Sequence, residues 1–295
     1  MTVYSINDLE QLSGIKAHTL RIWEQRYGVI TPQRTATNIR YYTDKDLRKV
    51  LNISLLNKHG YKISKIAKMP EPEILGAIEN ISKQSADDDT RIDTLAMAMV
   101  EMDELRFEQI VGSSIQSNGF EKTLQDLIFP FLDKINLLYL TGSIKPAQEH
   151  FITNLIRQKM IAAIDTIPFA EHLNTSKFLI FLPDGERQEL SLIYMHYLLK
   201  SRGIFVINLG CNLSVEDIAV AYEVHRPAYI YTMFNEPHKH AIQRRIDEYA
   251  AVFPTSTVLY SGYQMLTNYV TLPKNALVLR NLNETLMYLQ GLRES

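Results

Sequence analysis

Residues 5–42 are SINDLEQLSGIKAHTLRIWEQRYGVITPQRTATNIRYY, and the rest of the chain is expected to position this segment. Ser5 can cap a helix with apolar residues at helical spacing, and that helix ends at Gly14 because glycine permits a tight turn. A second helix is predicted over 17–25, with Trp23 as a core residue. Two short helices joined by a tight turn indicate a helix-turn-helix unit.

The second helix and the segment after it carry polar groups that could contact a nucleic acid. The outward face of the helix is mostly basic, which is typical of a recognition helix in the major groove. Residues 31–42 combine turn formers with β-favouring tyrosines and predict a hairpin wing. A helix capped by Thr43 and a short helix from Ile63 complete this head, residues 1–69. The candidate DNA contacts are Lys16, His18, Thr19, Arg21, Arg26, Tyr27, Arg34, Arg40 and Tyr41.

Charge is distributed unevenly along the chain. Residues 1–68 contain 12 Lys and Arg and 5 Asp and Glu, a net charge of +7, so residues 69–295 carry −9 of the total −2. A basic head on an acidic body favours duplex DNA as the partner of the head. The alternative is a solvated basic face on a small helical domain.

The order of motifs in the head supports a family assignment. The residues that define this order are Ser5, Ile6, Leu9, Leu12–Gly14, Thr19–Glu24, Tyr27, Gly28, Arg34, Arg40–Tyr42 and Leu47. They resemble the winged helix-turn-helix head of MerR-type regulators. The resemblance implies contacts to base edges from His18 and Arg21. The phosphate contacts it implies come from Arg26, Tyr27, Arg34 and Arg40.

Length and composition indicate a globular protein of two or three domains. The chain has 295 residues, of which 46% are hydrophobic. Its one cysteine, Cys211, excludes an intramolecular disulfide and suits a reducing compartment. No N-terminal signal pattern is visible, and the longest apolar runs are too short to span a bilayer. We therefore expect a cytoplasmic protein without a membrane segment.

The chain after the head divides into three parts. Residues 70–90 are rich in Pro, Ser and Asp and predict a linker with a short helix over 74–81. No sustained heptads follow the head, so self-association is expected to use a surface other than a coiled coil. Residues 91–172 show four helical stripes and predict a four-helix bundle, in which Pro130 kinks or breaks the third helix. Residues 173–295 alternate five strands with helices and predict a doubly wound, flavodoxin-like parallel sheet. The predicted elements include a helix over 186–201, a strand over 204–209, a helix capped by Ser214 and a helix over 237–252.

The bundle and the sheet together carry a second family resemblance. The residues that carry it are Ile135, Gly142, Glu149, His150, Pro183, Gly185, Glu186, Glu189, Leu190, Gly203, Leu209, Gly210, Val215–Asp217, Arg226, Pro227, Ser261 and Gly262. They resemble the cobalamin-binding module of methionine-synthase type. Joined to a MerR-type head, the module resembles the light-responsive, adenosylcobalamin-dependent repressors.

Several residues depart from that family where the cofactor chemistry would lie. The family's cobalt ligand is the histidine of an Asp/Glu-x-His-x-x-Gly motif, and this position is Gln188, a poor donor to cobalt. Ser191 adds bulk where the family's glycine admits the nucleotide tail. In the family a tryptophan shields the upper axial ligand, and a histidine can follow it. This chain has Tyr139 and Leu140 at these two positions. We therefore expect no bound cofactor, with cobalamin as the alternative.

Other residues at the family's site have two interpretations. Glu149 and His150 could form interhelical hydrogen bonds or retain a ligand role. For Thr232, Ser261 and Gly262 we favour ordinary core and turn positions over the lining of a cleft.

The sequence shows no other pattern typical of a metal, phosphate or catalytic site. The histidines lack zinc-ligand spacing, and neither a phosphate-binding glycine loop nor a nucleophile with its base is present in the sequence. No metal site and no catalytic residue are predicted. The histidines considered were His172, His196, His225, His238 and His240.

These observations predict a DNA-binding transcriptional regulator, as a repressor, rather than an enzyme. It would bind its operator as a homodimer or homotetramer, because one head makes too few contacts. The C-terminal half would serve as an oligomerisation or partner-docking platform that has lost its cobalt ligand. The alternatives are a corrinoid or other small molecule bound without a protein ligand, and the corrinoid-carrying subunit of a methyltransferase.

Overall fold

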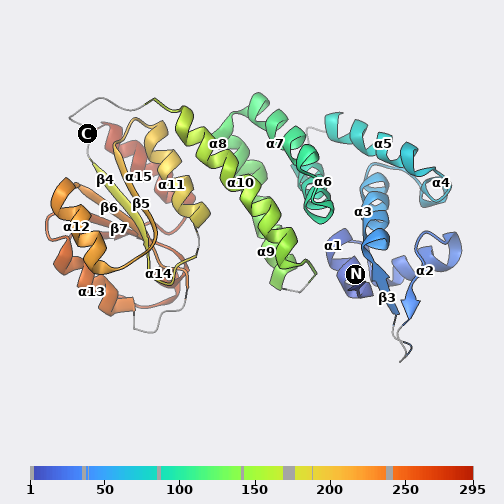
Figure 1. Ribbon diagram of the computed structural model, residues 1–295, viewed down its shortest axis with the longest axis horizontal. Coiled ribbons are helices and arrows are strands. Elements are labelled where there is room, and N and C mark those ends of the chain that lie inside the picture. The colour runs from blue at the N-terminus through green and yellow to red at the C-terminus, as the bar shows by residue number, and fades with distance from the viewer. Residues whose placement is uncertain are drawn as a thin grey trace. The chain divides into compact units, whose positions relative to one another are not determined.

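The computed structural model describes residues 3–34, 38, 40–84, 88–140, 143–168, 177–187, 189–236 and 242–294. The chain forms two compact units, Met1–Ile156 and Arg157–Ser295 (Figure 1). The first contains the head and most of the helical region. The second, called here the sheet unit, contains the parallel sheet.

The head is built from two short capped helices and a longer third helix. Ser5 caps α1 (Ile6–Ser13) through a capping box, in which the Asp8 N–H donates to the Ser5 hydroxyl at 3.2 Å. Gly14 ends α1 with a φ of 70°, a left-handed conformation that glycine adopts without steric cost. Helix α2 (Ala17–Tyr27) follows, and Thr43 caps α3 (Asp44–Lys58) as predicted. A single turn, α4 (Ile63–Ile66), completes the head.

The predicted wing is an antiparallel hairpin of β2 (Gln33–Arg34) and β3 (Arg40–Thr43). Its register places Arg34 opposite Arg40, at the end of the ladder nearest the loop. Strand β1 (Val3–Tyr4) pairs with the other edge of β3, so the wing is anchored to the start of the chain. Residues 35–37 and 39 of the wing lie outside the described residues.

The helix predicted over 74–81 within the linker 70–90 is longer than expected. Residues Glu71–Gln84 form helix α5, and the next helix, α6 (Asp88–Glu101), begins at Asp88. Ile74 and Ile78 are buried, because their spacing of four residues places both on the face that packs against α3. The proline in this stretch, Pro72, is tolerated in a first turn, where its missing N–H would have no partner in the helix.

The four predicted helical segments after residue 91 are confirmed. They are α6, α7 (Glu104–Asn118), the segment formed by α8 (Phe120–Thr123), η1 (Leu124–Ile128) and α9 (Phe129–Leu140), and α10 (Pro146–Thr166). The break expected at Pro130 is a π-helical turn just before it. In that turn the Phe129 N–H bonds Leu124 O, five residues back, so the chain changes its hydrogen-bond register where proline cannot donate.

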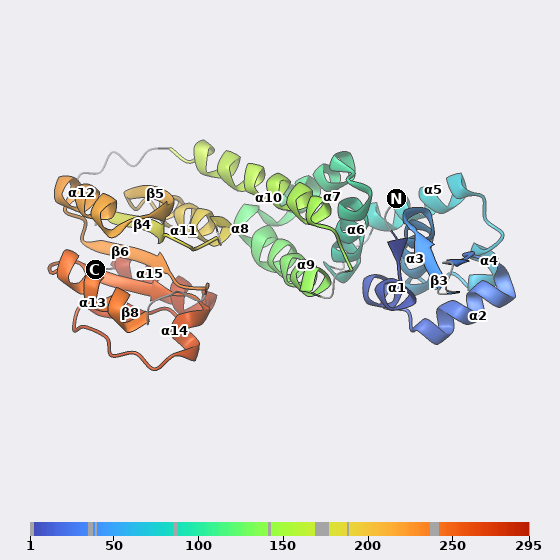
Figure 2. The ribbon, with the colours of Figure 1, turned by 60° about the horizontal axis from the view of Figure 1, so that its bottom comes forward.

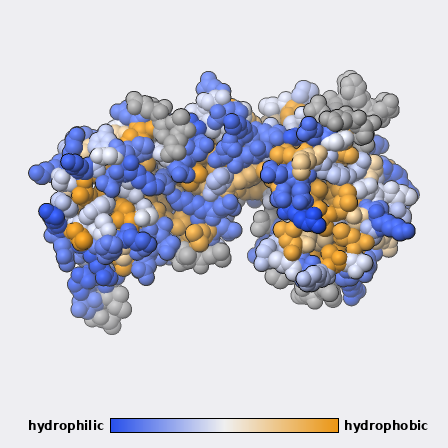
Figure 3. All heavy atoms as spheres, turned by 180° about the vertical axis from the view of Figure 1, so that it is seen from behind, coloured by the Kyte–Doolittle hydropathy of each residue, from blue (hydrophilic) through white to orange (hydrophobic). Residues whose placement is uncertain are grey.

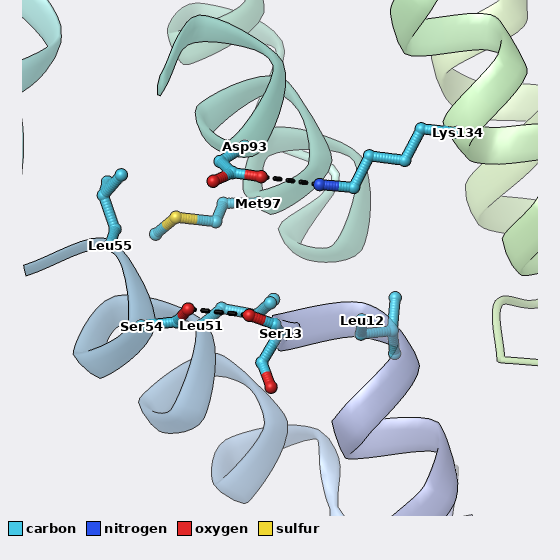
Figure 4. Close-up of a pocket in the computed structure, with 8 residues that line it drawn as sticks. All are labelled: Leu12, Ser13, Leu51, Ser54, Leu55, Asp93, Met97 and Lys134. Carbon is cyan, nitrogen blue, oxygen red and sulfur yellow. Dashed lines mark hydrogen bonds and ion pairs between the residues drawn. The ribbon is translucent and has the colours of Figure 1, made fainter. Parts of the chain in front are cut away.

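The head and the helical region meet at a charged bridge within the first unit. Asp93 of α6 accepts from Lys134 of α9 at 2.6 Å and also pairs with Lys58 of α3 (Figure 4). Beside it, the Ser54 hydroxyl donates to Ser13 O at 2.7 Å. Asp93, Lys134, Ser13 and Ser54 help to line a cavity of about 10 Å³, which is too small for anything larger than a water molecule.

The sheet unit contains five parallel strands in the order β5-β4-β6-β7-β8, which confirms the flavodoxin-like prediction (Figure 2). Strand β4, which lies between β5 and β6, is buried at all six positions, as expected for a strand covered on both faces. The strands are β4 (Phe178–Pro183), β5 (Val206–Leu213), β6 (Tyr229–Met233), β7 (Thr257–Ser261) and β8 (Ala276–Val278). The helices are α11 (Glu189–Ser201), α12 (Val215–His225), α13 (Ile242–Val252), α14 (Tyr263–Thr267) and α15 (Leu282–Glu294).

Two element bounds in this unit differ from the prediction. Helix α11 begins at Glu189 rather than Glu186, because the Glu186 carboxylate is buried in the turn after β4. The second strand runs over Val206–Leu213 rather than 204–209 and contains register shifts against β4. Gly210, with φ 81°, lies within this irregular part of the strand. The prediction for α13 began at Pro237, but residues 237–241 lie outside the described residues.

Candidate nucleic-acid interface and cofactor-site residues

Helix α2 separates its packing face from a solvent-exposed basic face. Leu20 is fully buried and Trp23 is 8% exposed, which confirms the core position predicted for Trp23. His18, Arg21 and Arg26 are exposed. Such a helix presents cations to an anionic partner while its apolar side holds it on the head.

The start of α2 is fixed by Glu10, a residue that the sequence analysis did not select. Lys16, the N-cap residue, makes no side-chain capping bond. Glu10 of α1 instead accepts from the Ala17 N–H at 2.8 Å and from Lys16 Nζ at 3.0 Å. The Ala17 N–H, followed by the Lys16 ammonium, holds the pKa of the Glu10 carboxyl below its usual value. The predicted contact Lys16 is therefore already paired in the unbound head.

The wing carries its arginines in two different environments. Arg34 Nη1 donates to the Asn38 side chain at 2.7 Å, so the guanidinium lies beside the wing loop. Arg40 Nε lies 3.9 Å from an oxygen of Glu24 on α2. Tyr41 donates to Gln33 across the hairpin at 2.7 Å. Both arginines are exposed and face solvent beside the recognition helix.

Tyr42 connects the wing to the recognition helix. Its hydroxyl donates to Glu24 Oε2 at 3.3 Å, and the residue is fully buried. Burial, together with the charge of Glu24, raises the pKa of Tyr42 to about 12, so this hydroxyl remains a donor at neutral pH. Nearby, the Arg26 guanidinium lies 5.6 Å from the Tyr27 ring centroid, a cation–π distance.

Comparison with known proteins places two domains on the chain. The model of the MerR HTH family regulatory proteins matches residues 4–71, and the B12 binding domain model matches residues 91–163. The chain therefore combines a MerR-type head with a cobalamin-binding-like module. Both resemblances predicted from the sequence are thus confirmed.

The relatives of this chain include transcriptional regulators. The HTH-type transcriptional repressor CarH of Myxococcus xanthus is 26% identical over 234 residues, 77% of this chain and 77% of CarH. The HTH-type transcriptional regulator MlrA of Escherichia coli K12 is 32% identical over 85 residues, 29% of this chain and 32% of MlrA.

A solved structure shares the fold. The monomethylamine corrinoid protein of Methanosarcina barkeri aligns with a TM-score of 0.53 and 10% identity, covering 71% of this chain and all of that one. At this identity the likeness shows the fold alone.

In the regulator's helical region, the residues at cofactor positions are largely exposed. Tyr139 is 47% exposed, and the side chain of Leu140 lies outside the described residues. Glu149 accepts from the Thr153 hydroxyl at 2.9 Å and lies 3.4 Å from His150 Nε2. Both of these contacts lie within α10, so they are intrahelical rather than interhelical.

In the sheet unit, Glu186 is held by the backbone. Its carboxylate is 4% exposed and accepts from the N–H groups of Asn235 and Glu236 at 2.9 and 3.2 Å. The carboxylate therefore anchors the loop after β6. Gln188 lies outside the described residues, and Ser191 on α11 is half-buried.

Ser261 and Gly262 serve the fold at the end of β7. The Ser261 hydroxyl donates to Leu279 O at 3.0 Å. Gly262 has φ 101°, and a Cβ there would lie 2.4 Å from Phe234 O. Thr232 is fully buried on β6, and its hydroxyl has no hydrogen-bond partner among the described residues. Ser261 and Gly262 thus make structural contacts at the turn after β7.

One carboxylate at these positions already has backbone partners. The motif carboxylate, Glu186, is engaged by two backbone amides, and the described part of the chain contains no group of three or more His, Cys, Asp or Glu residues that could hold a metal ion. None of the described helices has the length and apolar character that a membrane span requires.

Proposed function

We propose that this protein is a transcriptional repressor that binds operator DNA through α2 and the wing. One observation carries the proposal. His18, Arg21 and Arg26 are exposed on a helix that is braced against a hairpin carrying Arg34 and Arg40. Base edges would be read by His18 and Arg21, and phosphates by the remaining cations. The relative CarH is named a transcriptional repressor, which supports repression rather than activation.

The distribution of charge also favours DNA binding through the head. The head carries +7 and the remainder −9, so duplex is attracted to the head and repelled from the body. Chromosomal DNA as the partner places the protein in the cytoplasm. Nothing in this proposal requires catalysis, and the protein would act by occupying DNA rather than by transforming a substrate.

The regulator would bind as a dimer or tetramer, since one head contributes few base contacts and pseudo-palindromic sites require two. The sheet unit supplies surface for association. Hydrophobic residues gather on this unit when the molecule is seen from behind (Figure 3). Its exposed apolar side chains include Leu277, at 45%, and Met287, at 66%.

For the C-terminal half, we propose a platform that has lost protein-ligated cobalamin. A carboxamide at position 188 is a poor cobalt ligand, and Glu186 is occupied by backbone amides where the family motif has a carboxylate beside its ligand histidine. Such a regulator would repress constitutively or respond to another protein.

A second candidate is supported by the B12 binding domain match over residues 91–163. In this case a corrinoid or another small molecule binds without a protein ligand to the metal. Addition of adenosylcobalamin in the dark, followed by gel filtration and absorption spectroscopy, separates the two candidates. Co-elution of the corrinoid supports the second candidate, and a colourless protein peak supports the first.

The DNA-binding proposal is tested by fluorescence anisotropy with two labelled duplexes of equal length. One carries the promoter region of the protein's own gene and the other a random sequence. The wild-type protein should bind the promoter more tightly at physiological salt. Arg34→Ala should weaken both complexes and reduce the slope of log K against log salt by about 0.9, the value for one phosphate contact. Lys122→Ala, which removes an exposed cation of α8 outside the head, is the charge-matched control. Equal affinity of the wild-type protein for both duplexes would contradict the proposal.

A further inference from the structure

Glu24 is the one acidic residue of the recognition helix, and its position is unusual for a DNA-facing element. Helix α2 has the sequence AHTLRIWEQRY. The Glu24 side chain is 15% exposed and lies on the side of the helix that faces the wing. A carboxylate close to bound DNA repels phosphates, so an acid here weakens general attraction to duplex.

Both carboxylate oxygens of Glu24 face groups of strand β3. Oε2 accepts from the Tyr42 hydroxyl at 3.3 Å, and Oε1 lies 3.9 Å from Arg40 Nε. Tyr42 cannot move freely, because it is fully buried and pairs with Tyr4 in the small sheet. The Glu24–Tyr42 bond therefore fixes the separation between the recognition helix and the wing.

The ion pair with Arg40 has a different consequence. Arg40 has a 39% exposed side chain and is one of the predicted phosphate contacts. A guanidinium that shares its charge with a neighbouring carboxylate attracts phosphate less strongly than a free one. It also points in a defined direction, which favours a duplex whose backbone meets the wing at that point.

We propose that Glu24 is a positioning and specificity-determining residue, which sets the angle between recognition helix and wing through Tyr42 and restrains Arg40 so that random duplex is bound weakly. This inference rests on the proposed DNA-binding function. It assigns the acid a role in discrimination between DNA sequences, beyond a contribution to the stability of the head.

The test uses Glu24→Gln, which keeps an acceptor oxygen for the Tyr42 hydroxyl and removes the charge. It is compared with Arg40→Gln and with the double variant in the full-length protein, on the promoter and random duplexes between about 50 and 200 mM salt. Glu24→Gln should tighten binding to random duplex about threefold to tenfold, steepen the salt slope by about 0.9 and lower the ratio of promoter to random affinity. In the Arg40→Gln background the same change should leave the salt slope unaltered.

Tyr42→Phe separates the two contacts of Glu24. It removes the hydroxyl and retains the charge, so it should weaken promoter binding without changing the salt slope. Thermal melting of each variant shows that the head is folded.

The outcomes distinguish this inference from the function on which it rests. An unchanged salt slope for Glu24→Gln, or an equal effect on both duplexes, would overturn the role of Glu24. A wild-type protein that does not prefer its promoter would instead overturn the proposed function.

Discussion

In the head, basic side chains of the recognition helix face solvent, whereas in the sheet unit the polar side chains at the family's cofactor positions contact their own backbone. Arg21 and Arg26 are exposed, while Glu186 accepts two backbone N–H groups and Ser261 donates to Leu279 O. The same chain thus combines exposed cations in one region with polar groups that make structural contacts in another, and fold alone does not assign a function to either. Available side chains, rather than the fold, decide where the function lies.

The largest expected change in stability is at Gly262, in the sheet unit. Gly262→Ala places a Cβ 2.4 Å from Phe234 O at a φ of 101°. It should lower the free energy of unfolding of the sheet unit by roughly 2–4 kcal/mol. Denaturant unfolding followed by circular dichroism measures the change.

Gly112→Ala is the matched control for this substitution. Gly112 lies in α7, and a Cβ there meets no atom within 4 Å. This variant should be as stable as the wild type, or more stable by up to about 1 kcal/mol, because alanine favours a helix. If both glycine variants are as stable as the wild type, the claim that close packing requires glycine at position 262 is wrong.

A second prediction concerns the exposed cations of the head. Arg21→Ala should leave thermal stability unchanged and weaken promoter binding by about tenfold to a hundredfold, as expected for loss of one contact to a base edge. Binding to random duplex should change much less. Competition titrations with both duplexes measure the ratio of promoter to random affinity. An equal loss of affinity for the two duplexes would show that Arg21 contacts phosphate only.

A smaller effect is expected at the bridge between head and helical region. Burial alone would raise the pKa of Asp93, but Lys134 and Lys58 outweigh it and hold the pKa below its ordinary value. A lowered folded-state pKa stabilises the protein above about pH 4 and loses this contribution as the pH falls through the folded pKa. Asp93→Asn should cost about 1 kcal/mol at pH 7, because Lys58 is largely exposed.

The pH dependence checks this assignment. The difference in stability between wild type and Asp93→Asn should shrink as the pH falls below about 4, where the wild-type carboxylate becomes protonated. Urea unfolding at pH 7 and pH 3 gives the two differences. A constant difference would mean that the charge of Asp93 contributes nothing.

Much of the fold was predictable because local chemistry fixes it. Ser5, Thr43 and Ser214 cap helices that begin where they were predicted. Helix α5 was predicted too short, over 74–81, because Pro and Ser on either side suggested a linker, although Ile74 and Ile78 carried the helical spacing.

The candidate site was predictable only in part. The exposed cations follow from helical periodicity, but the hydrogen-bond partners of the carboxylates do not. Glu24 contacts a residue 18 positions away, and Glu186 contacts residues 49 and 50 positions away. Such pairs depend on how strands and helices meet, which spacing along the chain does not show.

The central claim is that the head binds specific DNA without help from a corrinoid. The most direct measurement is the affinity of full-length protein for its promoter duplex in the dark, with and without adenosylcobalamin. The account predicts tight, sequence-specific binding that adenosylcobalamin does not change. Promoter binding that appears only when adenosylcobalamin is present would contradict it.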